Sequence, residues 1–169
     1  MLSILLAAAV AVTSAFQLSS PAFKSGDAIP AKYTCDGLNI SPPLQWEDVP
    51  QNTQSIAIVV DDPDAPSGLW THWILYNLAP SMRSLQERVS KDFKLPDGSM
   101  QAENDYGKPG YGGPCPPSGT HHYIFHAYAL DKKLTLPEAA KRKAFDRAIE
   151  GHVLAKSELT AAYKRQEKS

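Results

Sequence analysis

Three segments of this 169-residue chain carry side chains that could bind or transform a charged ligand. The first runs from Asp61 to Asp64 and follows directly on an apolar, β-branched run. Its three carboxylates stand within four residues and repel one another, which raises the pKa of at least one of them. A carboxyl group that stays protonated can donate a hydrogen bond to an anion. The alternative is a solvated turn, because Asp-Pro commonly starts turns.

The second segment places a histidine between two tryptophans. His72 stands between Trp70 and Trp73, so we expect it to be partly buried. A buried imidazole needs a hydrogen-bond partner, which is either a group of the core or a ligand. His72 is therefore a candidate site residue, and a structural histidine satisfied by the core is the alternative.

The third segment, Gly112 to Tyr123, combines glycines, prolines and histidines. Glycines let backbone N–H groups approach a ligand, prolines stiffen the loop, and such loops can form anion-binding nests. If a strand starts near His121, its alternation places His121, Tyr123 and Phe125 on one face. His121 and Tyr123 are therefore the candidate ligands of this segment. The other histidines are expected to be structural or surface residues: His122, His126 and His152.

The elements that must position these segments are strands first and helices last. The sequence predicts three strands, over residues 55–60, 73–78 and 122–130, with a long Gly/Pro-rich loop over residues 97–118. It predicts two helices after them, over residues 139–150 and 153–165, the first behind a capping box from Thr135 to Glu138. This order favours an α+β fold with a mostly antiparallel sheet over a βαβ arrangement.

Long motifs in these segments resemble one family. Asp-Pro-Asp-Ala-Pro begins at Asp62, and Gly-Pro-x-Pro-Pro-x-Gly-Thr-His-x-Tyr ends at Tyr123, with the Trp/His-rich strand start between them. Together they resemble the signature of phosphatidylethanolamine-binding proteins. Residues 32–43, 104–111 and 151–155 are similar to the bacterial and archaeal Raf-kinase-inhibitor-like (YbhB/YbcL-type) branch. The resemblance covers about residues 16 to 163.

The resemblance implies an α+β, mainly β fold, in which a large antiparallel sheet packs on a smaller one, with helices near the carboxyl end. It also implies an anion site without a metal or a cofactor. Carried over by motif, the ligand-binding residues are Asp62, Asp64, His72, Pro117, His121 and Tyr123, with Trp70 nearby. Ser67-Gly68-Leu69 stands where animal members carry a tyrosine, so the rim of the pocket differs and phosphatidylethanolamine itself is a doubtful ligand.

We therefore expect a non-catalytic binding or regulatory protein for phosphate or phosphorylated head groups. Kinase inhibition follows from the family name alone. One alternative is an inhibitor of a peptidase or kinase that acts through protein contacts. Others are a zinc site, or a small hydrolase that uses the same acidic residues and histidines, although neither Ser118 nor Cys115 is a convincing nucleophile.

Bulk composition sets the remaining expectations. The net charge of -1 argues against nucleic-acid binding. Residues 1–15 read as a signal peptide, which predicts an exported, periplasmic or secreted domain over residues 16–169 without a later membrane segment. The two cysteines, Cys35 and Cys115, can form a disulfide in an oxidising compartment. A homodimer is a further expected partner state.

Overall fold

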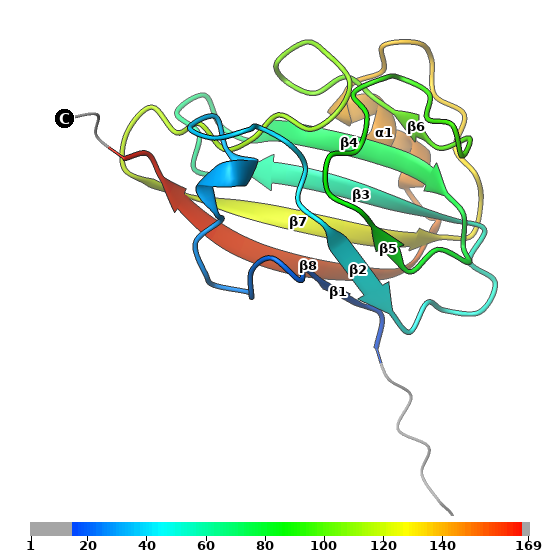
Figure 1. Ribbon diagram of the computed structural model, residues 1–169. Helices are drawn as coiled ribbons and strands as arrows, with labels where there is room; N and C mark the ends of the chain where they lie inside the picture. The colour runs from blue at the N-terminus through cyan, green and yellow to red at the C-terminus, as the bar shows by residue number, and fades with distance from the viewer. Residues whose placement is uncertain (1–14, 167–169) are drawn as a thin grey trace, which may run out of the picture.

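The computed structural model describes residues 15–166 as two antiparallel sheets and one short α-helix (Figure 1). The larger sheet has the order β6-β4-β3-β7-β8, and the smaller one has the order β1-β2-β5. The strands are β1 (Gln17–Ser19), β2 (Leu44–Glu47), β3 (Ser55–Asp62), β4 (Trp70–Leu78), β5 (Ser84–Leu85), β6 (Met100–Gln101), β7 (Thr120–Leu130) and β8 (Val153–Lys164). The helices are a 3-10 turn over Ala31–Tyr33 and α1 (Arg142–Ile149).

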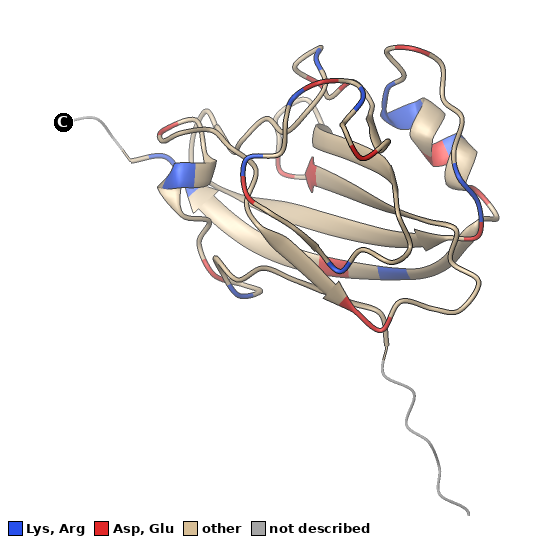
Figure 2. Cartoon of the chain, turned by 45° about the vertical axis from the view of Figure 1, so that its right-hand side comes forward, with Lys and Arg blue, Asp and Glu red and all other residues tan. Residues whose placement is uncertain are grey.

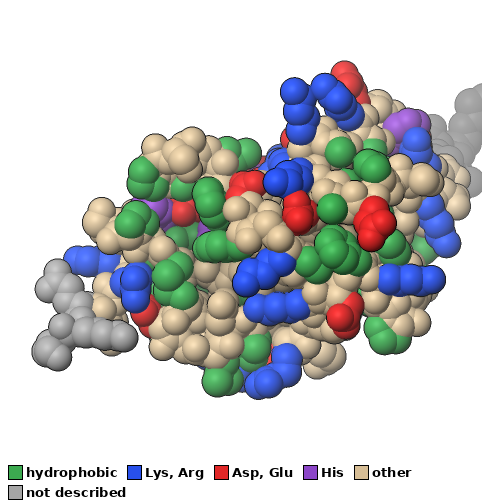
Figure 3. Space-filling model, turned by 90° about the horizontal axis from the view of Figure 1, so that it is seen from above, with side chains coloured by type: hydrophobic (Ala, Val, Ile, Leu, Met, Phe, Trp, Pro, Cys, Tyr) green, Lys and Arg blue, Asp and Glu red, His purple; other side chains and the backbone are tan. Residues whose placement is uncertain are grey.

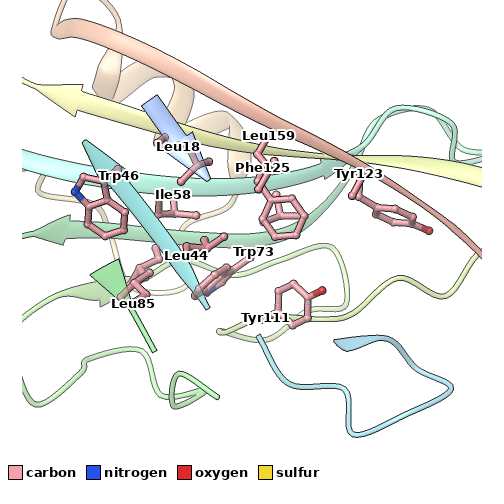
Figure 4. Close-up of a cluster of buried hydrophobic side chains, with 14 of the residues drawn as sticks. Leu18, Leu44, Trp46, Ile58, Trp73, Leu85, Tyr111, Tyr123, Phe125 and Leu159 are labelled. Atoms are coloured by element: carbon pink, nitrogen blue, oxygen red, sulfur yellow. The ribbon is translucent and has the colours of Figure 1, made fainter. Parts of the chain in front are cut away.

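The larger sheet is buried on both faces, which explains the continuous apolar run of β3. One face packs against the smaller sheet, and Figure 4 shows the side chains that meet there, among them Trp46, Trp73 and Phe125. The opposite face packs against α1 through Phe145 and Ile149. Every residue of β3 is buried, so this strand forms the centre of the molecule.

A β-bulge in β4 sets the direction of His72 near the carboxyl end of β3. Thr71 pairs with Asp61, but Trp73 already pairs with Val60, so one extra residue stands between the two pairs. The extra residue is His72. Because of this shift, Trp73 enters the core beside the smaller sheet, while His72 and Trp70 face the same cavity.

The predicted fold class is confirmed, but the carboxyl-terminal part was predicted wrongly. The segment expected as a second helix is the strand β8, which pairs with the whole length of β7. Buried residues alternate along its second half at Leu159, Ala161 and Tyr163, the period of a strand. Pairing with β7 outweighs the helix propensity of its Ala, Leu, Lys and Glu residues.

The first helix is shorter than the predicted one. It begins after Lys141, which makes no side-chain cap, so the Thr135 to Glu138 segment is not a capping box. Ala139 adopts a positive φ of 54° just before the helix. This left-handed residue interrupts helical geometry and delays the start of α1.

The predicted pairing of the cysteines is confirmed. Cys35 and Cys115 form a disulfide with their Cα atoms 5.4 Å apart. The bond joins the loop after the 3-10 turn to the loop before β7, and Cys35 N also donates to Pro114 O. The amino-terminal segment is thereby fixed to the loop that approaches the candidate site.

Two expectations concern membranes and export. Among the described residues, no helix is long and apolar enough to span a bilayer. The predicted signal peptide lies almost wholly outside the described part of the chain, so its removal stays a prediction.

Candidate ligand-binding site

The three predicted segments meet because of strand direction. β3 runs antiparallel to both β4 and β7, so its carboxyl end lies beside the starts of these two strands. A cavity of about 290 Å³, the first cavity, opens there. It is lined by Asp62, Ala65, Pro66, Ser67, Trp70, His72, Tyr106, Cys115, Pro116, Pro117, His121 and Tyr123. From above, histidine side chains show at the base of a hollow surrounded by hydrophobic side chains (Figure 3).

Six of the seven predicted ligand-binding residues line this cavity, and Asp64 does not. The Asp64 carboxylate instead accepts hydrogen bonds from the backbone N of His122 at 2.8 Å and from its Nδ1 at 2.7 Å. These bonds fix the turn after β3 to the start of β7. Asp64 therefore supports the wall of the cavity from outside.

Asp62 and His121 form a buried pair at one side of the cavity. Nδ1 of His121 lies 2.7 Å from Oδ2 of Asp62, and a carboxylate only accepts, so this nitrogen carries the proton. The other carboxylate oxygen accepts from the backbone N of Asp64 at 2.8 Å. The pair thus leaves Nε2 of His121 as the ring nitrogen without a partner among the described residues.

His72 is held on the opposite side by the glycine-rich loop. Its Nδ1 lies 2.6 Å from the carbonyl O of Gly112, whose backbone N donates to the carbonyl O of His72. Because a carbonyl only accepts, Nδ1 carries the hydrogen and Nε2 is left without a partner in the described structure. Burial lowers the pKa of His72, although Gly112 and nearby carboxylates act against this effect. At neutral pH its Nε2 is therefore an acceptor.

Two further polar atoms at the cavity lack a well-formed hydrogen bond. Across residues 15–166, these buried side-chain atoms are Trp70 Nε1, which lies near the Tyr106 side chain, and the hydroxyl oxygen of Tyr123, which lies near Asp62. Burial, and then the charge of Asp62, raise the pKa of Tyr123. Its hydroxyl stays protonated, so both groups can donate a hydrogen bond toward a ligand.

The expected mutual repulsion of the three carboxylates is not what the structure shows. Asp61 points to the opposite face of the sheet from Asp62, and Asp64 points to His122. Hydrogen bonds from His122 lower the pKa of Asp64. Burial alone would raise the pKa of Asp61, but His126 and Arg142 outweigh burial and lower it. The three side chains diverge because successive residues of a strand alternate and the turn redirects the third.

The charge of the cavity is unusual for an anion site. No Lys or Arg is among the described residues that line it. Within the described chain, no group of three His, Cys, Asp or Glu side chains could hold a metal ion. The cavity therefore offers neutral donors and acceptors around one carboxylate, which suits a ligand that both donates and accepts hydrogen bonds.

Sequence reasoning missed Tyr106 and the network around Asp61. Tyr106 packs edge-on against Trp70 and His72, with ring centroids 5.4 Å and 5.6 Å away. It comes from the loop between β6 and β7, where its spacing carried no signal. Arg142 lies in α1 and reaches Asp61 across the far face of the sheet. A partner for a buried carboxylate was to be expected, but not its place in a helix 81 residues away.

Comparison with known proteins agrees with the motifs. A family model described as phosphatidylethanolamine-binding protein matches residues 19–164. A UPF0098 protein from Methanothermobacter thermautotrophicus is 50% identical over 148 residues, which are 88% of this chain and 98% of the relative. A UPF0098 protein from Aquifex aeolicus is 45% identical over 155 residues, 88% of each chain.

Solved structures show the same fold. A putative phosphatidylethanolamine-binding protein homologue from Chlamydia trachomatis superposes with a TM-score of 0.83 at 41% identity, covering 90% of this chain and 99% of that one. Escherichia coli YbcL, described as a new member of the mammalian family, gives a TM-score of 0.84 at 33% identity over 90% of this chain and 100% of its own. The chain therefore belongs to the phosphatidylethanolamine-binding protein family.

Proposed function

We propose that this protein binds a small phosphate-like oxyanion, or the phosphorylated head group of a larger molecule, in the first cavity and releases it unchanged. One observation carries the proposal: Trp70 Nε1 and the Tyr123 hydroxyl are buried at the cavity without a well-formed hydrogen bond. A buried polar group left unsatisfied costs about 1–3 kcal/mol. A ligand oxygen that accepts from these donors offsets this cost.

His72 and Asp62 together favour a ligand that is an anion and also carries a hydrogen that it can donate. Nε2 of neutral His72 accepts, so it favours a ligand group that can donate. Asp62 adds negative charge to the wall and disfavours a dianion. Dihydrogen phosphate, a monoanion, meets both conditions, because its P–O oxygens accept and its P–OH groups donate. A phosphorylated head group offers the same oxygens, and lipids of the kind named by the family are one source of it.

We therefore expect that the protein takes up a proton when the ligand binds and that the affinity rises as the pH falls. An anion that enters the cavity raises the pKa of His72, because a protonated ring donates to it at Nε2. In the empty protein burial lowers that pKa, so the proton arrives together with the ligand. Affinity then rises as the pH is lowered from 8 toward about 6.5, the ordinary range of histidine.

Calorimetry with inorganic phosphate and with phosphoethanolamine tests the proposal. Tyr123→Phe removes one donor and keeps the ring, so binding should weaken roughly threefold to tenfold. Tyr76→Phe is the matched control, because Tyr76 is buried on the α1 face of the same sheet. Equal affinity in the Tyr123→Phe and wild-type proteins, or no binding of either compound to wild type, contradicts the proposal.

A specific observation favours a second candidate, a small hydrolase. The Asp62–His121 pair has the geometry of a carboxylate that orients a general base. Against it, Cys115 is held in the disulfide, and in the described structure no hydroxyl group hydrogen-bonds to His121. Turnover of a chromogenic phosphate ester that is abolished by His121→Ala would establish this candidate in place of simple binding.

Export is proposed from the sequence of the leader alone. Residues 2–16 are uncharged and largely apolar, and small residues precede Phe16. Amino-terminal sequencing of protein from the producing cell should therefore begin at or near Phe16. Protein that still carries Met1 contradicts the proposal.

A further inference from the structure

A second cavity lies on the other side of Tyr106. It has a volume of about 170 Å³ and shares two lining residues, Tyr106 and Cys115, with the first cavity. Since a water molecule occupies about 30 Å³ in the liquid, the space is large enough for a small solvated ion. The rest of its lining comes from Cys35, Asn39, Lys91, Asn104, Lys108, Pro109, Tyr111, Gly112 and Gly113.

The charge of the second cavity is opposite to that of the first. Lys91 and Lys108 line it, and no Asp or Glu is among its described lining residues. Of the ion pairs described in residues 15–166, none involves either ammonium, although other lysines such as Lys32 and Lys156 are paired with glutamates. In Figure 3, Lys and Arg side chains lie beside the hollow with the histidines and not within it. Two positive charges therefore stand uncompensated at this cavity.

Lys91 is held in place by its surroundings. Its Nζ donates to the carbonyl O of Asn39 at 3.1 Å, and its stem lies against Gly110. A Cβ at position 110 would come within 2.7 Å of the Lys91 Cβ, so this close approach requires a glycine. Burial, and then the charge of Lys108, lower the pKa of Lys91. The two ammonium groups thus line one cavity, where their like charges oppose each other.

Asn39 and Asn104 fix the loops that form the rest of the wall. Oδ1 of Asn39 accepts from the backbone N of Gly113 at 2.7 Å, and Nδ2 of Asn104 donates to the carbonyl O of Gly110 at 2.8 Å. With its oxygen engaged, Asn39 leaves its Nδ2 group without an acceptor in the described chain. The second cavity therefore presents two ammonium groups and a side-chain amide donor on a fixed loop.

We propose that the second cavity is a separate site for a fully ionised oxyanion, a phosphate or a carboxylate group, bound by Lys91 and Lys108. An anion between the two ammonium groups replaces their mutual repulsion by attraction to both. Its hydrogen bonds to them are of the charge-assisted kind. The site does not depend on the function proposed for the first cavity, because its charges and nine of its eleven lining residues are its own.

NMR titration of the ¹⁵N-labelled full domain with inorganic phosphate, and separately with acetate, distinguishes the two sites. The backbone amides of Asn39 and Lys108 report on the second cavity, and those of His121 and Tyr123 report on the first. We expect saturable shifts at Asn39 and Lys108 with at least one of the two anions. The anion that produces them identifies the group that the site prefers.

Removal of the charges should affect only the second site. Lys91→Gln/Lys108→Gln should weaken the response of Asn39 roughly tenfold or more and leave the response of His121 unchanged. The control Lys132→Gln/Lys133→Gln removes the same net charge from an exposed turn elsewhere, where neither lysine is paired. Because Lys108 is exposed, Lys108→Gln alone serves if the double variant does not fold.

Three results would overturn the proposal. The first is a wild-type protein in which neither anion shifts Asn39 and Lys108 saturably. The second is an equal weakening by the Lys132/Lys133 control, which would mean that total charge and not a site is responsible. The third is an unchanged response at Asn39 in the Lys108→Gln protein. If the first cavity does not bind phosphate, the backbone amide signals of His121 and Tyr123 will not shift. That result does not contradict the proposal for the second cavity.

Discussion

Asp61 and Asp62 are consecutive residues at the end of β3, but their side chains lie on opposite faces of the sheet. Asp61 faces α1, where Arg142 and Thr71 donate to it and Nε2 of His126 lies 3.2 Å away. Asp62 faces the first cavity, where Nδ1 of His121 donates to it. Figure 2 shows this acidic strand end enclosed by the surrounding chain, with α1 alongside.

The difference lies in how completely each group is satisfied. On the α1 side the network continues outward, because His126 also meets Glu158 and Arg142 also meets Asp146. On the cavity side, the donors of Trp70 and Tyr123 lack a well-formed hydrogen bond. A buried network in which every group is hydrogen-bonded stabilises the fold, whereas donors around a cavity that lack a hydrogen bond are available to a ligand. Burial and charge alone would not have separated the two aspartates.

The largest expected effect is on the saturated side. Asp61→Ala leaves Arg142 and His126 without their shared carboxylate, so the free energy of unfolding should fall by about 3–5 kcal/mol. Urea denaturation followed by circular dichroism measures it. Asp62→Ala is the matched control and should cost less, because water in the cavity can hydrate His121. A larger loss for Asp62→Ala than for Asp61→Ala would contradict the comparison.

The second effect concerns the disulfide at the wall of the cavities. Cys35→Ser/Cys115→Ser frees a loop of 80 residues in the unfolded chain, and we expect a loss of about 2–4 kcal/mol. Reduction of the wild-type protein should give a similar loss in urea denaturation. A double variant as stable as the oxidised protein would show that Asn39 and Pro114 hold this loop without the bond.

A smaller effect is the acid response of His72. Burial lowers its pKa in the folded protein, so below about pH 6.5 the unfolded chain binds a proton that the folded protein does not. The free energy of unfolding therefore falls as the pH is lowered through this range. In His72→Gln the fall should be shallower between pH 7 and 5 in urea denaturation. An unchanged slope would mean that His72 is readily protonated in the fold.

The smallest effect has the opposite sign. Tyr123→Phe removes a buried hydroxyl that makes no well-formed hydrogen bond, so the stability of the empty protein should be unchanged or rise by up to about 1 kcal/mol. Thermal unfolding without ligand measures it. A loss of more than about 1 kcal/mol would show that the hydroxyl has a partner in solution and would weaken the argument for a ligand.

Six of the seven residues predicted from the motifs line the first cavity, whereas the second predicted helix is the strand β8. Long motifs identify individual residues. Because β3 is antiparallel to both β4 and β7, Asp62, His72 and His121 lie at the same end of the sheet. Asp64 shares the motif but serves the turn, because the chain has already left the strand when it reaches this residue. The orientation of Asp62 therefore does not predict the orientation of the Asp64 side chain.

The errors of secondary structure share one cause. β8 carries helix-forming residues, but β7 offers a partner for its whole length, and long-range pairing is not visible in local propensity. The alternation of Leu159, Ala161 and Tyr163 was a readable signal for a strand. No local pattern could place Arg142 beside Asp61 or Lys91 beside Lys108, because these contacts depend on how distant segments fold back.

The most direct test compares two adjacent histidines. His121 faces the first cavity, whereas His122 is exposed and pairs with Asp64. Calorimetry with inorganic phosphate at pH 6 should show that His121→Ala binds roughly tenfold or more weakly than wild type, since a charged hydrogen bond contributes about 1.5–3 kcal/mol. His122→Ala should bind as wild type does. Equal affinities for all three folded proteins would contradict the assignment of the first cavity as the anion site.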